Sequence, residues 1–151
     1  MASGSRKNCS VVAEHSPYQA VILDHYRNPR GQREVIDELL RAEVSNPVCG
    51  DRLRLGFRDG DAGALNDLHY HAKACAVATA SASLMWEYLG AETDRDVLRT
   101  HAEHVLAFLD DDEQELEETY AALRPLEDLR AFPMRLNCAK LPWKALLQSV
   151  K

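Results

Sequence analysis

The spacing of hydrophobic side chains changes twice along the chain, from a helical period to a strand-like one and back again. A first helix is predicted over residues 17–28, where apolar positions recur at intervals of three and four. A capping-box pattern from Ser16 to Gln19 marks its start. Its end is marked by Pro29, because proline disfavours helical geometry in the residue before it.

Alternating apolar and polar side chains follow this helix. Residues 42–48 form a candidate short strand, and over residues 52–58 arginine alternates with leucine and phenylalanine. Turn-forming residues occupy positions 59–63, after which the alternation resumes over residues 68–73. The two alternating segments predict an antiparallel hairpin, and together with the first strand they predict a sheet of about three strands.

Helical spacing returns at residue 75. Small and apolar residues fill positions 75–89 without a helix breaker, and Gly90 follows them, which predicts a buried helix with a glycine C-cap. Thr93, with Asp96 three positions later, predicts the N-cap of a second amphipathic helix. The apolar side of that helix consists of Val97, Leu98, Val105 and Leu106.

The next segment is first acidic and then rich in proline. The run from Asp110 to Glu118 predicts a solvated helix start, because carboxylates are favourable in a first helical turn; docking of a partner is the alternative role. Pro125 and Pro133 bracket a predicted connector. A closing helix follows, and Pro142 is expected near its start because proline is tolerated in a first turn.

These elements predict the α+β class, with a small antiparallel sheet covered on one face by several helices. A chain of 151 residues is about the size of one ordinary domain, and no internal repeat is visible. We therefore expect a single domain over residues 16–151. Residues 1–15 are small and polar, and we expect them to form a flexible tail; Cys9 in that tail has no motif around it.

Charge and composition exclude several classes of function. A net charge of -6 and a pI near 5.5 disfavour nucleic-acid binding, which relies on clustered Lys and Arg. No apolar run reaches the roughly 18 residues of a membrane span, and the polar start lacks the apolar stretch of a secretory signal. We therefore expect a cytoplasmic protein. In that reducing compartment the four cysteines indicate metal binding or thiol chemistry rather than disulfides.

Three of the cysteines lie at boundaries between predicted elements, where functional side chains gather. Cys75 and Cys138 are expected close to helix N-termini, which favour the thiolate. Cys49 is followed by Gly50 and Asp51, so one tight turn can direct a thiol and a carboxylate to the same point. Three thiolates and one carboxylate suit tetrahedral zinc, and iron is also compatible with them.

Other interpretations of these residues stay open at this point. A single free cysteine is more often a small buried hydrophobe, and Asp51 also has the chemistry of a turn cap. A purely structural metal is a further alternative, although structural sites usually have only Cys and His ligands. The negative charge of a four-anion site requires an offset, for which the candidates are Lys73, Arg135 and Lys140.

The segments around these residues resemble the SufU/IscU/NifU N-terminal domain family. The resemblance rests on residues 24–29, 46–51, 75–83 and 135–139 and covers nearly everything after Ser16. The long interval between Cys75 and Cys138 is similar to the SufU branch, which carries a helical insertion, here near residues 95–123. The chaperone motif typical of IscU is absent. Ala74 departs from the family, which usually has glycine there.

The resemblance implies a SufU/IscU-like fold and a zinc-dependent sulfur acceptor for iron–sulfur cluster assembly. A cysteine desulfurase of the SufS type would pass persulfide sulfur to Cys49, so that the chain acts as a sulfurtransferase only with that partner. The implied metal ligands are Cys49, Asp51, Cys75 and Cys138, and Arg135 is a possible assistant. Downstream iron–sulfur assembly proteins are further implied partners. The alternative is a scaffold that assembles a 2Fe–2S or 4Fe–4S cluster on the same ligands.

Overall fold

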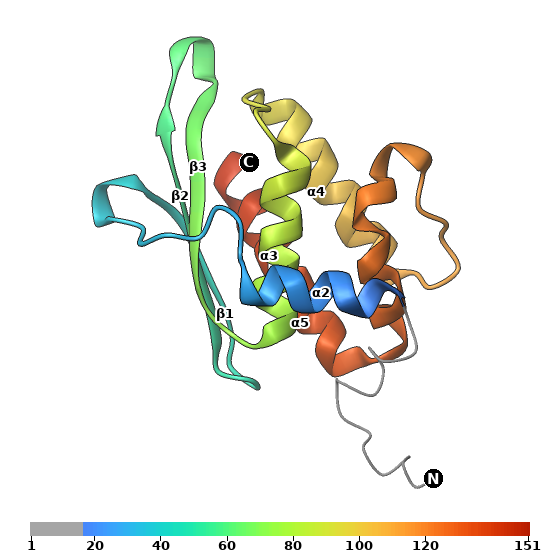
Figure 1. The fold of residues 1–151 in the computed structure, drawn as a ribbon. Helices are drawn as coiled ribbons and strands as arrows, with labels where there is room; N and C mark the ends of the chain where they lie inside the picture. Colours follow the sequence, from blue (N-terminus) through green and yellow to red (C-terminus); the bar gives the residue numbers. More distant parts are fainter. Residues whose placement is uncertain (1–16) are drawn as a thin grey trace, which may run out of the picture.

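The sheet in the computed structural model has three antiparallel strands in the order β1–β2–β3 (Figure 1). The strands are β1 (Leu40–Asn46), β2 (Asp51–Asp59) and β3 (Leu65–Lys73). A short 3-10 turn, η3 (Asp61–Gly63), joins β2 to β3, which confirms the predicted hairpin. The structure describes residues 17–151, so Ser16, Cys9 and the predicted tail lie outside the described residues.

The alternation in β2 explains which face of the sheet is buried. Leu53, Leu55 and Phe57 are at most 1% exposed and belong to the main core. The arginines between them point to the other face, where Arg54 pairs with Asp37 and Arg52 with Glu43. One face of the sheet is therefore apolar and must be covered by helices.

Five longer helical segments lie on that side of the sheet (Figure 1). The helices α3 and α5 pack directly against the strands, and α2, α4 and η4 pack around these two. This arrangement confirms the α+β prediction. The segments are α2 (Pro17–Arg27), α3 (Ala76–Leu89), α4 (Arg95–Asp110), η4 (Glu118–Ala131) and α5 (Pro133–Val150); a short 3-10 turn, η2 (Asp37–Leu39), precedes β1.

The central helix α3 is made of small residues, which let its neighbours approach closely. Ser83, fully buried, bonds to His25 Nδ1 of α2 at 2.6 Å and accepts a hydrogen bond from the Arg30 amide at 2.9 Å. Gly90 ends α3, as predicted. No helix in the described part of the chain is long and apolar enough to cross a membrane.

The N-cap of α4 differs from the prediction. It is Asp94 rather than Thr93, and the Asp94 side chain accepts hydrogen bonds from the amides of Asp96 and Val97. Thr93 is engaged elsewhere, because its carbonyl accepts a hydrogen bond from the Leu65 amide at the start of β3. A tertiary contact to the hairpin therefore moves the helix start by one residue.

The predicted connector between Pro125 and Pro133 is wrong. Pro125 lies inside the 3-10 helix η4, and Pro133 is already the first residue of α5. Pro142 consequently lies inside α5 and not near its start. The local rule for proline was outweighed by packing, since α5 contacts α3, α4, β1 and β2 along its length.

The acidic run was predicted to start a helix, and only its end does so: Glu117 is the N-cap of η4 and Glu118 is its first residue. Asp110 ends α4, and residues 111–117 form a connection to η4 with exposed carboxylates. The backbone of this connection is held by Arg130, whose guanidinium donates to the carbonyls of Phe108, Asp111 and Gln114. The insertion expected near residues 95–123 corresponds to α4, this connection and the first turns of η4.

Candidate metal centre

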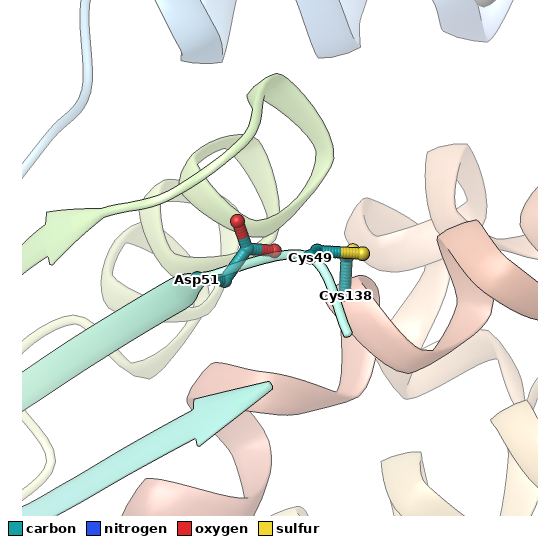
Figure 2. A group of neighbouring side chains, drawn as sticks. All are labelled: Cys49, Asp51 and Cys138. Carbon is teal, nitrogen blue, oxygen red and sulfur yellow. The ribbon is translucent and has the colours of Figure 1, made fainter. Parts of the chain in front are cut away.

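The four candidate ligands come from four separate segments that meet at one end of the sheet. Cys49 lies in the turn between β1 and β2, and Asp51 is the first residue of β2. Cys75 is the N-cap of α3, and Cys138 lies in the second turn of α5. One ligand atom each of Cys49, Asp51 and Cys138 lies within 4.8 Å of the other two (Figure 2).

The turn that carries Cys49 is set by Asn46 and Gly50. The Asn46 carbonyl accepts hydrogen bonds from the amides of Cys49 at 3.2 Å and Gly50 at 2.8 Å, and its side chain accepts one from the Val48 amide. Gly50 has a φ of +74°, which a residue with a Cβ rarely adopts. Sequence reasoning had assigned no role to Asn46, although an Asn before proline is a typical turn signal.

Asp51 offers one unused carboxylate oxygen to the site. Its Oδ1 accepts a 2.9 Å hydrogen bond from the Cys75 amide, which orients the carboxylate. The residue is only 4% exposed, and its Oδ2 is buried without a hydrogen-bond partner. A buried carboxylate oxygen without a partner is costly, and a cation beside it removes that cost.

The distance between two of the thiols fits a tetrahedral ion. The Sγ atoms of Cys49 and Cys138 are 3.8 Å apart. Two sulfur ligands at about 2.3 Å from a tetrahedral zinc ion are themselves separated by about 3.8 Å. The donor set and the unused Asp51 oxygen therefore both fit a zinc ion, and the same thiols are compatible with iron.

Cys75 borders this group without belonging to it in the present geometry. Its side chain accepts a hydrogen bond from the Ala78 amide at 3.5 Å, as expected for an N-cap thiol. It also contacts the Cys138 thiol, which affects the pKa values of both residues. The structure thus brings three of the four predicted ligands together and places the fourth beside them.

The pKa values of two thiols at this site are raised. Burial raises the pKa of Cys138, and the adjacent Asp51 carboxylate and Cys75 thiol raise it further. Burial also raises the pKa of Cys75 and outweighs the opposing effect of the Ala78 amide. The expected position at a helix N-terminus is confirmed for Cys75, the N-cap of α3, but not for Cys138, which lies inside α5. For both thiols the raised pKa runs against the expected preference for the thiolate.

The candidate counter-charges are only partly available to the site. Lys140 forms a 2.5 Å ion pair with Asp110 and so neutralises a carboxylate elsewhere. Arg135, one helical turn before Cys138, stacks with its guanidinium 5.2 Å from the centre of the Phe132 ring. Lys73 is exposed at the end of β3, two residues before Cys75. Of the three candidates, this leaves Arg135 and Lys73 as the two that are not paired with Asp110.

Two further sequence questions have clear structural answers. Ala74 has no positive φ, so its replacement of the glycine usual at this position costs no backbone strain. Three of the described histidines have partners away from the thiols. His25 contacts Ser83, His71 contacts Glu34, and His101 contacts Tyr120.

Known proteins share this fold and much of this sequence. The family model described as NifU-like N terminal domain matches residues 17–150. The zinc-dependent sulfurtransferase SufU of Bacillus subtilis is 34% identical over 137 residues, 88% of each chain. The iron–sulfur cluster assembly scaffold protein IscU of Streptococcus pyogenes is 25% identical over 134 residues, 89% of this chain and 82% of that one. The solved N-terminal part of a NifU-like protein from Brucella abortus has the same fold, with a TM-score of 0.73 at 21% identity over 93% of this chain and 94% of that one.

Proposed function

The chain belongs to the NifU-like N-terminal domain family, and from this membership we propose that it works in iron–sulfur cluster assembly as a zinc-dependent sulfur acceptor. The sulfur donor is a cysteine desulfurase of the SufS type, and downstream assembly proteins receive the sulfur. The similarity to the zinc-dependent sulfurtransferase SufU supports this choice within the family. The group formed by Cys49, Asp51 and Cys138 supports it independently.

The observation that carries the proposal is the unequal exposure of the ligand group. Cys49 is exposed in the β1–β2 turn, whereas Cys138 and Asp51 are 3% and 4% exposed. A partner protein therefore reaches Cys49 directly but reaches Cys138 only after the site has opened. The Cys75 residue is exposed too, but its sulfur is partly desolvated and already accepts the Ala78 amide hydrogen bond. Cys49 is the thiol best placed to accept sulfur.

The proposed transfer is a thiol–disulfide type of exchange without net oxidation. The Cys49 thiolate attacks the outer sulfur of the persulfide on the desulfurase cysteine, a new S–S bond forms on Cys49, and the old S–S bond breaks. The desulfurase cysteine leaves as a thiolate, and the outer sulfur keeps its proton as it is transferred, which gives a persulfide on Cys49. Only a sulfur atom changes its carrier.

Zinc held by Cys49, Asp51, Cys75 and Cys138 would keep its cysteine ligands deprotonated at neutral pH. Asp51 supplies the hard oxygen ligand, and the Cys75 amide holds its carboxylate in place. Arg135 lies on the same side of α5 as Cys138, three positions before it, and its permanent charge favours an anionic sulfur nearby. We assign Arg135 an assisting role on that ground.

The test is to incubate the zinc-loaded protein with a SufS-type desulfurase and cysteine and to locate added sulfur by mass spectrometry of intact protein and peptides. We expect one added sulfur on Cys49 and increased sulfide release with a reductant. Cys49→Ala should abolish both signals, and Cys9→Ala should leave both unchanged. Sulfur acceptance by the Cys49→Ala variant would assign the acceptor role to another thiol.

A cluster scaffold is the second candidate function, and the similarity to the IscU scaffold protein favours it. The same three thiols would then ligate iron instead of zinc. Anaerobic reconstitution with ferrous iron and sulfide distinguishes the two functions. A coloured protein that transfers its cluster to an acceptor supports the scaffold, and a colourless protein that keeps its zinc supports the sulfur acceptor.

A further inference from the structure

Two serines on α3 are fully buried and hydrogen-bonded in opposite directions. Ser83 faces α2, as described above, and Ser81 faces α5. The Ser81 hydroxyl donates a 2.7 Å hydrogen bond to the carbonyl of Ala139. Ala139 directly follows the ligand Cys138, and α3 begins at the ligand Cys75. The Ser81–Ala139 hydrogen bond therefore joins the two helices that carry these thiols.

The turn of α5 around Cys138 has less support of its own than an ordinary helical turn. Pro142 lies four residues after Cys138 and has no N–H to donate to the Cys138 carbonyl. Its ring also crowds that carbonyl, as proline does inside any helix. The backbone position of Cys138 is consequently fixed less by α5 itself and more by contacts from outside the helix.

The hydrogen bonds of Ser81 hold this turn of α5 from outside the helix. Besides donating to Ala139, its oxygen accepts a 3.2 Å hydrogen bond from the indole Nε1 of Trp143, the residue after Pro142. Ser81 and Trp143 are both 0% exposed, so no water replaces either bond. A buried hydroxyl that uses both its donor and its acceptor holds its partners in one arrangement.

We propose that Ser81 is a positioning residue of the metal centre, which fixes the Cys138 thiol relative to Cys75 and Asp51 and thereby raises the affinity for the ion. Ser81 touches no ligand atom, so it acts only through the backbone next to Cys138. The inference rests on the proposed function only in that a metal occupies this site. It makes no use of sulfur transfer.

The test compares Ser81→Ala with Ser83→Ala. Both substitutions remove a hydroxyl from a fully buried position of the same helix, but the partners of Ser83 are His25 of α2, the Arg30 amide in the following turn and the Tyr70 hydroxyl of β3, and none of these elements carries a ligand. The affinity for zinc is measured by competition with a chromophoric chelator. We expect Ser81→Ala to lower it about tenfold or more, as losses of outer contacts to metal sites do. Ser83→Ala should keep the wild-type affinity even if it unfolds more easily.

Two more measurements keep the test valid if the metal-free variants fold poorly. The rate at which zinc-loaded protein releases its ion to excess chelator needs no stable metal-free form, and it should rise for Ser81→Ala only. The absorption spectrum of the cobalt-substituted protein reports ligand geometry, and it should change for Ser81→Ala only. Wild-type affinity in Ser81→Ala, or equal losses in both variants, would overturn the proposal.

These outcomes are separate from those of the proposed function. If wild-type protein binds zinc but accepts no sulfur while Ser81→Ala still weakens zinc binding, the sulfur-acceptor function fails and the role of Ser81 stands. If sulfur is transferred to Cys49 while Ser81→Ala binds zinc normally, the role of Ser81 fails and the sulfur-acceptor function stands.

Discussion

Replacing Gly31 by alanine tests whether the turn after α2 depends on close packing against Trp86. Gly31 has a φ of +82°, and a Cβ atom added to it would lie 2.3 to 2.4 Å from three ring atoms of Trp86. The ring is not free to rotate away, because its Nε1 donates a 2.7 Å hydrogen bond to the Leu68 carbonyl. The substitution therefore combines backbone strain with a steric clash.

The expected loss of stability follows from these two contributions. A side chain in left-handed geometry costs about 1–2 kcal/mol, and overpacking of a well-packed site costs about 1–3 kcal/mol more. The free energy of unfolding should therefore fall by about 2–5 kcal/mol. For a domain of this size each kcal/mol lowers Tm by about 2–4 °C, so Tm should fall by about 4–20 °C.

Gly63→Ala is the matched control for the clash. Gly63 has a φ of +80°, but nothing lies within 4 Å of an added Cβ atom. This variant should lose only the backbone contribution, about 1–2 kcal/mol. Thermal unfolding of both variants, followed by circular dichroism in the same metal-free buffer, gives the comparison. An equal Tm for the two variants would show that packing against Trp86 adds nothing, and the reasoning from the Gly31 contact would be refuted.

Three further predictions concern the metal centre and pH. Asp51→Asn keeps an acceptor for the Cys75 amide but loses the charge beside the ion, so zinc affinity in the chelator competition should fall at least about tenfold. Zinc affinity should also fall as pH is lowered, because Cys49, Cys75 and Cys138 bind the ion as thiolates and every thiol proton present before binding must leave. Burial raises the pKa values of Cys138 and Cys75 and so favours their protonated forms. Each released proton changes the affinity about tenfold per pH unit, so three thiols give up to about 1000-fold, and calorimetry in buffers of different ionisation enthalpy counts the protons. Burial lowers the pKa of His25 below its ordinary value of 6.5, so the folded state binds this proton less readily than the unfolded one. The urea midpoint should therefore fall as pH drops below about 6.5, and His25→Gln should flatten that dependence; an unchanged slope in this variant would assign the effect to another group.

The class of fold was predictable because it depends on local periodicity. Alternation in residues 52–58 is enough to place Leu53 and Leu55 on a buried face, and the same rule gives the hairpin. The positions of the prolines were predicted wrongly because they depend on tertiary contacts and not on local periodicity. Pro142 is acceptable inside α5 only because of contacts with other elements, and no rule about neighbouring residues contains that information.

The convergence of the candidate metal ligands was predictable only in part. Cys49, Gly50 and Asp51 form one local turn, so their convergence follows from sequence alone. The approach of Cys138 depends on how α5 crosses the sheet, and only the family resemblance indicated it. The same resemblance also covers residues 24–29, and the contacts of Asp24 in this segment belong to the fold. Asp24 forms an ion pair with Arg30, and the backbone amide of Arg30 donates a hydrogen bond to the buried Ser83. A shared motif therefore does not by itself mark a residue of the site.

The contacts of α5 also bear on how the protein forms during synthesis. The helix packs on α3, α4, β1 and β2, and it carries both Cys138 and the fully buried Trp143. A ribosome adds these residues after the three strands of the sheet and the other described helices. Until α5 emerges, the part of the apolar sheet face that it covers stays open, and the candidate ligand set lacks Cys138. Completion of the core and completion of the ligand set thus await the same helix.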